Sequence, residues 1–230
     1  VILTLTLLKI RLWLGIPLGL VAGTALFIWL GRKVQNELER LFTRAGDLLK
    51  KQQWEPAIAV MKEGYKLAPR QFMVKGTLDG QIGVIQYLRR KTDVAEPLLQ
   101  SASMQHYVAK TMLAILQWQR GEKKKAKATF DLALKAGKKE SLLYGVYAYV
   151  LCEMKERDAA IEVLNRGLKV CKDDDRLLQN RNLLQNGMGG IDWAGLPLVC
   201  AYLGVTQIEP FIDAMQVLLT YEPPNDGAKD

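Results

Sequence analysis

The sequence predicts an all-α protein made of an N-terminal transmembrane helix, an α-solenoid of about four helical hairpins, and a small helical module at the C-terminus. Three features predict it: a 19-residue run without charge, small residues that recur at fixed spacings, and a reversal of charge near residue 187. They divide the 230 residues into an N-terminal segment (1–11), a span (12–30), a repeat domain (31–186) and an acidic module (187–230). Because 49% of the residues are hydrophobic, the composition is typical of packed domains and not of disorder.

The transmembrane prediction rests on the run from Leu12 to Leu30. As a helix with a rise of about 1.5 Å per residue, this run is roughly 28 Å long, close to the thickness of the hydrocarbon core of a bilayer. Trp13 and Trp29 stand near its two ends, where aromatic rings favour the membrane interface. We therefore expect an uncleaved anchor. The alternative is a cleavable signal peptide with its processing site at the small residues 22–25.

The flanking charges predict which side of the membrane the repeat domain occupies. Lys9 and Arg11 precede the run, and more basic residues follow it within about 20 positions: Arg32, Lys33, Arg40, Arg44 and Lys50. This asymmetry favours a cytoplasmic repeat domain. Residues 1–8 are also apolar and the chain begins at Val1, so we expect an incomplete N-terminal segment. More basic charge in that segment, or a cytoplasmic turn at residues 9–11 between two spans, would reverse the assignment.

Within the run, glycines recur every four residues and so share one helix face. These are Gly15, Gly19 and Gly23. Small residues at this spacing let a second helix approach closely within a membrane, which predicts a transmembrane helix–helix contact. The alternative is that glycine is simply common in membrane helices.

Four segments between residues 45 and 170 share one pattern of small and large residues. A small residue in a first helix stands 12 positions before a small residue in a second helix, followed by a large apolar residue four positions later and another small one three further on. The four sets are Ala45, Ala57, Met61 and Gly64; Gly83, Ala95, Leu99 and Ala102; Ala114, Ala126, Phe130 and Ala133; and Ala148, Ala160, Leu164 and Gly167. The sets begin 38, 31 and 34 residues apart, which predicts stacked helical hairpins. Residues 173–186 predict a closing helix with Asp173 to Asp175 at its positive N-terminal end.

This pattern resembles the tetratricopeptide repeat (TPR) family over about 140 residues, from about 38 to 186. Pro69 matches the proline that often ends a second helix in that family, and Tyr144 matches a large aromatic residue near the start of a first helix. Lys138 and Lys172 replace the expected prolines, and the second unit, with Pro97 inside its second helix, matches least well. The resemblance implies a concave groove lined by the first helices and a protein partner.

The groove positions that the resemblance implies are apolar and aromatic. They lack the Lys and Asn side chains with which some TPR proteins clamp an acidic C-terminal peptide. We therefore expect a helical or extended apolar segment as ligand, although the alternative is that some of these side chains are buried between hairpins. The candidate partner-binding residues are Phe42, Leu49, Val84, Tyr87, Ile115, Trp118 and Tyr149.

The acidic module begins where the charge balance changes. Residues 188–230 contain one basic residue, Lys229, and six acidic residues, a net charge of 1 − 6 = −5. Because the whole chain has a net charge of +8, residues 1–187 carry +13. The module predicts a glycine-rich linker at 187–190, one helix from Asp192 through Tyr202, and a second over about 207–221. Its glycine-rich, Asp-aromatic and Leu-Pro elements at 187–204 also resemble a bacteriophage tail-assembly accessory family, over about 20 residues.

The sequence predicts no enzyme, no metal and no cofactor. His106 is its one histidine, and its three cysteines show no C-x-x-C spacing. Phosphate-binding loops, nucleophile elbows and zinc-protease motifs are absent from the sequence. Basic clusters at 89–91, 123–127 and 138–139 are expected to be solvated turns and helix faces; anionic lipid or an acidic partner is the alternative, and nucleic acid is not expected.

These features together predict a membrane-anchored scaffold or adaptor in the bacterial inner membrane that binds a protein partner, in envelope assembly or quality control. The alternative is a stoichiometric structural subunit of a larger membrane complex, whose groove is filled permanently.

Overall fold

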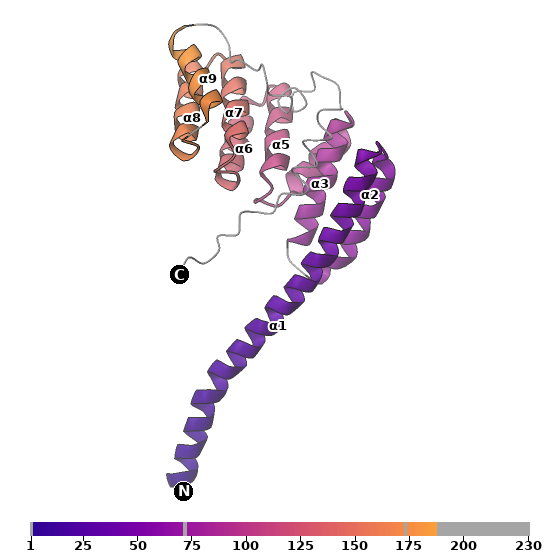
Figure 1. Ribbon diagram of the computed structural model, residues 1–230, viewed down its shortest axis with the longest axis vertical. Helices are drawn as coiled ribbons and strands as arrows, with labels where there is room; N and C mark the ends of the chain where they lie inside the picture. The colour runs from indigo at the N-terminus through magenta and orange to yellow at the C-terminus, as the bar shows by residue number, and fades with distance from the viewer. Residues whose placement is uncertain (1, 71–72, 173, 188–230) are drawn as a thin grey trace.

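The computed structural model describes the backbone of residues 2–70, 73–172 and 174–187, and side chains from residue 20 onward, except 25–27, 30 and 70. The predicted acidic module lies outside the described residues beyond Gly187. Every regular element in the described part is helical, which confirms the all-α prediction. The elements follow one another along a stack of helix pairs, from which a long N-terminal helix projects (Figure 1).

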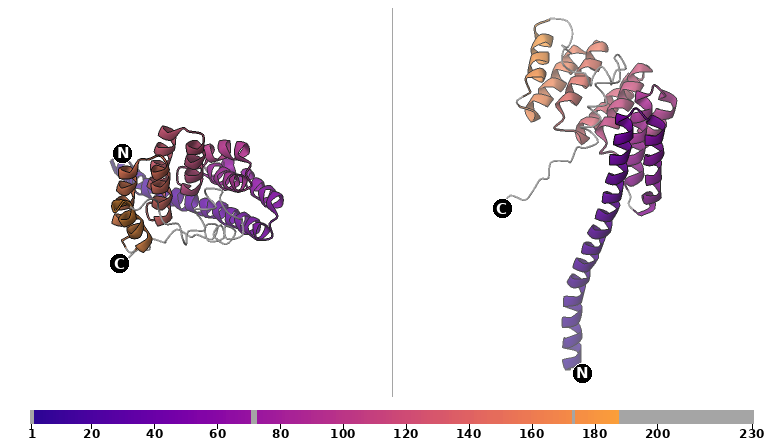
Figure 2. Two further views of the ribbon diagram at one scale, coloured as in Figure 1. Left: turned by 90° about the horizontal axis from the view of Figure 1, so that it is seen from above. Right: turned by 45° about the vertical axis from the view of Figure 1, so that its right-hand side comes forward.

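The first helix, α1, runs unbroken from Ile2 to Lys50, a length of 49 residues. Its N-terminal part stands clear of the other helices, and only its C-terminal part packs against α2 and the short helix η1 (Figures 1 and 2). The sequence predicts a boundary at Leu30, where the uncharged run ends. Helical hydrogen bonds join backbone groups whatever the charge of the side chains, so the helix continues through Arg32 and Lys33 without a break.

The prediction of a transmembrane helix at 12–30 is wrong. No helix in the described part of the chain combines the length and the apolarity that crossing a bilayer requires. The prediction rested on the absence of charged residues between positions 12 and 30. In the structure these residues belong to one longer helix, α1, whose C-terminal part carries many charged residues. The predicted membrane localisation depends on that span and is wrong for the same reason. The transmembrane packing role of Gly15, Gly19 and Gly23 also requires that span and has no basis without it.

The remaining helices pack most extensively in consecutive pairs: the end of α1 with α2, then α3 with α4, α5 with α6 and α7 with α8. Helix α9 closes the described stack against α8 and α7. The bounds are α2 (Trp54–Glu63), η1 (Gly64–Arg70), α3 (Val74–Leu88), α4 (Thr92–Ser101), α5 (Tyr107–Gln119), α6 (Lys123–Ala136), α7 (Ser141–Glu153), α8 (Arg157–Val170) and α9 (Asp175–Gln185).

Each pair crosses at the small residues that the sequence singles out. Gly83 shows why they must be small, because a Cβ placed there would meet Leu99 Cδ2 at 3.0 Å. The other members of this crossing set are fully buried: Ala45, Ala57, Ala95, Ala114, Ala126, Ala148 and Ala160. The four large residues that follow are fully buried as well: Met61, Leu99, Phe130 and Leu164. The two helices of a pair therefore approach closely and enclose one large side chain per pair.

The same turn joins the two helices of all four pairs. A residue with positive φ ends the first helix, and the next backbone N–H donates to a carbonyl five residues earlier, as in Gln53 to Leu48 (2.9 Å) and Glu156 to Leu151 (2.9 Å). This is the Schellman arrangement, which satisfies carbonyls at a helix end. The positive-φ residues are Gln52 (58°), Arg90 (61°), Gly121 (80°) and Lys155 (64°).

We predict that Gly121→Ala lowers the free energy of unfolding by about 1–2 kcal/mol, because an L side chain is strained in the left-handed region. The space around Gly121 is open, so the loss measures backbone strain without a packing clash. The matched control is Gly145→Ala in the interior of α7, where the space is also open and alanine should stabilise by about 0.5–1 kcal/mol. Urea unfolding measures both, and equal shifts for the two variants would contradict the assigned turn.

Candidate functional site

The seven predicted partner-binding residues fall into two groups in the structure. Four of them belong to the core and expose less than a tenth of their surface: Leu49, Val84, Tyr87 and Ile115. Three are half-buried and pack against the core from its edge: Phe42, Trp118 and Tyr149. Only the second group presents surface that a ligand can contact without rearrangement of the core.

Trp118 and Tyr149 are the two predicted residues that the structure joins directly. Trp118 lies in the last turn of α5 and Tyr149 near the end of α7, so they come from successive first helices. Their ring centroids are 6.3 Å apart and the ring planes meet at 81°, an edge-to-face contact. Such a contact holds both rings in one orientation and contributes about 0.5–1.5 kcal/mol beyond the buried area.

Two ionisable side chains of the first helices near this pair, Cys152 and Tyr87, are neutral at pH 7. Burial raises the pKa of the Cys152 thiol, which lies three residues after Tyr149, and the charge of Glu153 raises it further. Burial also raises the pKa of Tyr87, although the charge of Arg90 opposes the shift. These first-helix side chains, Tyr87, Trp118, Tyr149 and Cys152, therefore offer apolar and aromatic contacts.

Gly15, Gly19 and Gly23, the glycines that share one helix face, lie in the projecting part of α1. Gly23 is exposed, and no atom lies within 4 Å of the position that a Cβ would take there. The side-chain surroundings of Gly15 and Gly19 fall outside the described residues. Exposed apolar side chains near Gly23 are Leu20, Val21, Ile28 and Trp29.

The sequence analysis missed a buried polar cluster between α3, α4 and η1. The Asp79 carboxylate is 3% exposed and accepts hydrogen bonds from the Tyr65 hydroxyl (2.5 Å) and the Ser101 hydroxyl (2.9 Å). Nearby, the buried Lys110 ammonium donates to the Gln100 carbonyl at 3.2 Å, and burial lowers its pKa. An aspartate inside an apolar first helix is the signal that could have identified this cluster. Its hydrogen-bond donors come from two other elements, η1 and α4, and could not be found by spacing.

His106 lies beside this cluster as the N-cap of α5. Its Nδ1 accepts a hydrogen bond from the Ala109 backbone N–H at 3.2 Å, so the neutral ring carries its proton on Nε2. Nε2 is shielded from solvent and has no hydrogen-bond partner among the described residues. The ring fits against α3 only because residue 80 is glycine, since a Cβ there would lie 2.5 Å from His106 Cδ2.

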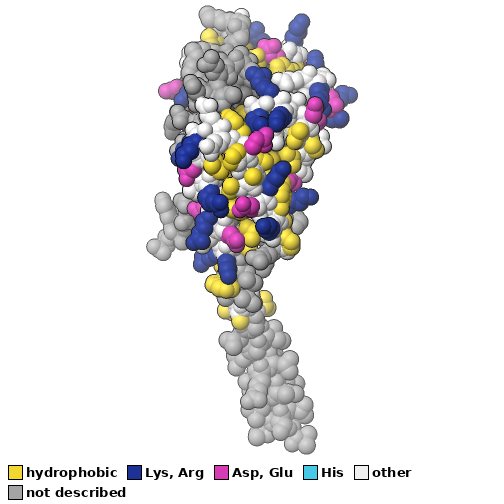
Figure 3. All heavy atoms as spheres, turned by 90° about the vertical axis from the view of Figure 1, so that its right-hand side faces the viewer, with side chains coloured by type: hydrophobic (Ala, Val, Ile, Leu, Met, Phe, Trp, Pro, Cys, Tyr) yellow, Lys and Arg dark blue, Asp and Glu magenta, His cyan; other side chains and the backbone are white. Residues whose placement is uncertain are grey.

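Ion pairs between helix pairs partly neutralise two of the basic clusters, 89–91 and 123–127, and also hold Arg120. Arg89 pairs with Glu55 at 2.7 Å, Arg120 pairs with Glu96, and Lys127 pairs with Glu156 at 2.8 Å. On the face drawn in Figure 3, Lys and Arg side chains are interspersed with Asp, Glu and apolar ones over the helix pairs. Surface pairs of this kind contribute about 0–1 kcal/mol each, so they orient side chains more than they stabilise the stack.

No three His, Cys, Asp or Glu side chains of the described residues come together as a potential metal site. No protein-family model matches the chain, and no curated protein is similar to it in sequence.

We predict that acid weakens the fold through His106. Burial and the positive charge of Lys110 lower the pKa of His106 from 6.5 to about 4, so the folded state favours the neutral ring. Its contribution to stability is therefore fully present above pH 6.5 and is lost as the pH falls toward 4, by at most about 1.4 kcal/mol per pH unit.

Because His106 is the one histidine of the chain, an NMR titration of its ring reads this pKa without ambiguity. The control is His106→Asn, which keeps an N-cap acceptor but does not titrate in this range. Denaturant unfolding between pH 7 and 4.5 should show a steeper loss for the natural chain than for the variant. A ring that titrates at 6.5, or parallel losses for the two proteins, would contradict the burial argument.

Proposed function

We propose that this protein is a helical-repeat scaffold that binds a protein partner through the Trp118–Tyr149 pair. The observation that carries the proposal is the edge-to-face contact of two half-buried aromatic rings from successive first helices. Partly exposed aromatic side chains that are already fixed in place lose little conformational freedom on binding, which is typical of residues that dominate protein interfaces.

The ligand that fits this surface is an apolar helical or extended segment. Fixed charges are absent from the pair, and the neighbouring Cys152 thiol is neutral at pH 7. An acidic or phosphorylated peptide would need cationic partners that this pair does not supply, whereas an apolar side chain gains from burial between two rings.

The repeat architecture supports a binding role over an enzymatic one. The four crossing sets, the four matching turns and the resemblance to the TPR family all favour a stack whose first helices form a continuous surface for a partner. Catalysis would need a constellation of reactive side chains, and the buried polar cluster around Asp79 is instead satisfied internally by Tyr65 and Ser101.

Trp118→Ala and Tyr149→Ala should each reduce recovery of the partner at least tenfold, because aromatic anchors commonly contribute 2 kcal/mol or more, roughly 30-fold in affinity. Both variants should keep their helix content and lose only about 0.5–1.5 kcal/mol of stability, the energy of the ring contact. The measurements are affinity purification of the full chain with quantitative mass spectrometry, beside thermal melts by circular dichroism.

The matched control is Trp54→Ala, which removes another half-buried tryptophan from α2, a second helix at the other end of the stack. If Trp118 and Tyr149 were packing residues alone, each truncation would leave a cavity costing about 3–5 kcal/mol, and partner recovery would follow stability in all three variants. A partner recovered in a fixed, salt-resistant ratio would identify the chain as a structural subunit instead of an adaptor. Folded variants that bind as before would exclude this surface.

A further inference from the structure

The end of α9 repeats the geometry that ends the first helix of every hairpin. In the four hairpins the positive-φ residue stands seven positions after the small crossing residue, as Lys155 follows Ala148. In α9, Gly187 has a φ of 78° and stands seven positions after Asn180, which is buried. The Gly187 N–H also points back to the Leu184 carbonyl (3.4 Å), as the Lys155 N–H does to that of Cys152 (2.8 Å). Helix α9 therefore ends with the same turn that, in each of the four hairpins, leads from the first helix into the second.

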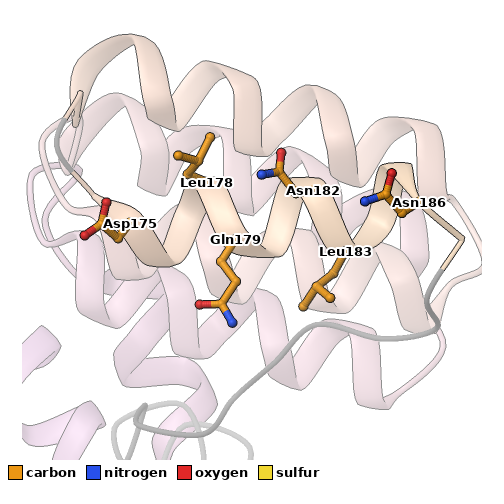
Figure 4. A pocket seen from close by; sticks show the side chains of 6 residues that line it. All are labelled: Asp175, Leu178, Gln179, Asn182, Leu183 and Asn186. Carbon is orange, nitrogen blue, oxygen red and sulfur yellow. The ribbon is translucent and has the colours of Figure 1, made fainter.

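One face of α9 is uncovered in the described part of the chain. A hollow of about 350 Å³ lies over it (Figure 4), and Leu178, on this face, is 40% exposed. The lining residues are Asp175, Leu178, Gln179, Asn182, Leu183 and Asn186. The residues 32 positions earlier, in α7 and at its C-cap, are all buried: Leu143, Val146, Tyr147, Val150, Leu151 and Met154. In α7 this face is covered by the helices that follow in the chain, α8 and α9.

The chain that follows Gly187 carries the sequence pattern of a second helix. Ala194, Leu198 and Ala201 repeat the spacing of small, large apolar and small residues found in Ala160, Leu164 and Gly167. Asp192 stands two positions before Ala194, as Asp158 stands two before Ala160. The connection is two residues longer than in the other hairpins, and the glycine-rich stretch 188–190 accommodates the difference.

We propose that residues 191–204 dock on the uncovered face of α9 as the second helix of a fifth hairpin. The segment follows α9 directly and is long enough to return along it. The segment is also nearly free of charge, with Asp192 as its one charged residue, which suits a face lined by leucine and amide side chains. The two apolar side chains of the face, Leu178 and Leu183, then contact the apolar side of the segment, and the amide side chains form the rim.

The test measures how fast a thiol reagent labels a cysteine on this face in the full chain. Leu178→Cys places the probe on α9, and Val170→Cys is the matched control on α8, where the natural residue is 49% exposed. Cys171, which adjoins position 170, is replaced by Ser in both probe variants, and peptide-resolved mass spectrometry separates the probes from Cys152 and Cys200. We expect Cys at 178 to react at least tenfold more slowly than Cys at 170, despite similar exposure in the described structure.

Adding Leu198→Asp to each probe variant should release the segment and accelerate labelling at 178 at least tenfold, with no change at 170. Ala201→Glu is a second disrupting change, and circular dichroism checks that the stack stays folded in both. Equal labelling at 178 and 170, or protection at 178 that neither change removes, would overturn the proposal. Protection that rises with protein concentration would overturn it too, because it would assign the face to a second copy of the chain.

Discussion

The close crossing of two helices at small buried residues is the contact on which the rest of this structure depends. Where Ala114 meets the second helix of its pair, the absence of larger side chains lets the two backbones approach, and Phe130 fills the space one turn further on. Phe130 also stacks on Tyr147 of the next pair, with ring centroids 4.6 Å apart. One crossing therefore sets the position of the aromatic contact that joins two pairs. A larger residue at a crossing would force apart the helices on which both contacts rest.

The uniform turn within each pair is a consequence of that crossing. Two helices that cross at fixed positions 12 residues apart leave a connection of one length, and the chain meets it each time with a left-handed residue. Only Gly121 among these four suits that conformation, so Gln52, Arg90 and Lys155 hold it at a cost that helix packing must offset. Tertiary packing thus overrides local preference at three of the four turns.

Helix α3 shows how the pairs are joined to one another. Gly76 and Gly80 leave a notch on its surface, and the connection between α4 and α5 fills that notch with Ser103 and the ring of His106. The Ser103 backbone N–H donates to the Gly76 carbonyl at 3.0 Å, and the His106 side chain caps α5 from the same connection. The start of the third pair is therefore fixed on the second by backbone and ring contacts that no larger residue at 76 or 80 would permit. Asp79, between the two glycines, adds hydrogen bonds to Tyr65 and Ser101.

The sequence by itself determined the helical class, the register of the four pairs and the N-cap of α9, because these depend on the spacing of small, apolar and capping residues along one segment. Asp174 accepts from the Arg176 and Leu177 N–H groups at 3.1 Å, at the end where the sequence places an acidic cap. The end of α1 was not predictable from charge. The uncharged run stops at Leu30, but the helix continues through Arg32 and Lys33, because the charge of a side chain does not determine backbone hydrogen bonding. Only the tertiary structure decided which candidate side chains are accessible. Val84 and Ile115 are buried while Trp118 and Tyr149 keep exposed surface and contact each other, since burial is set by helices distant in the chain.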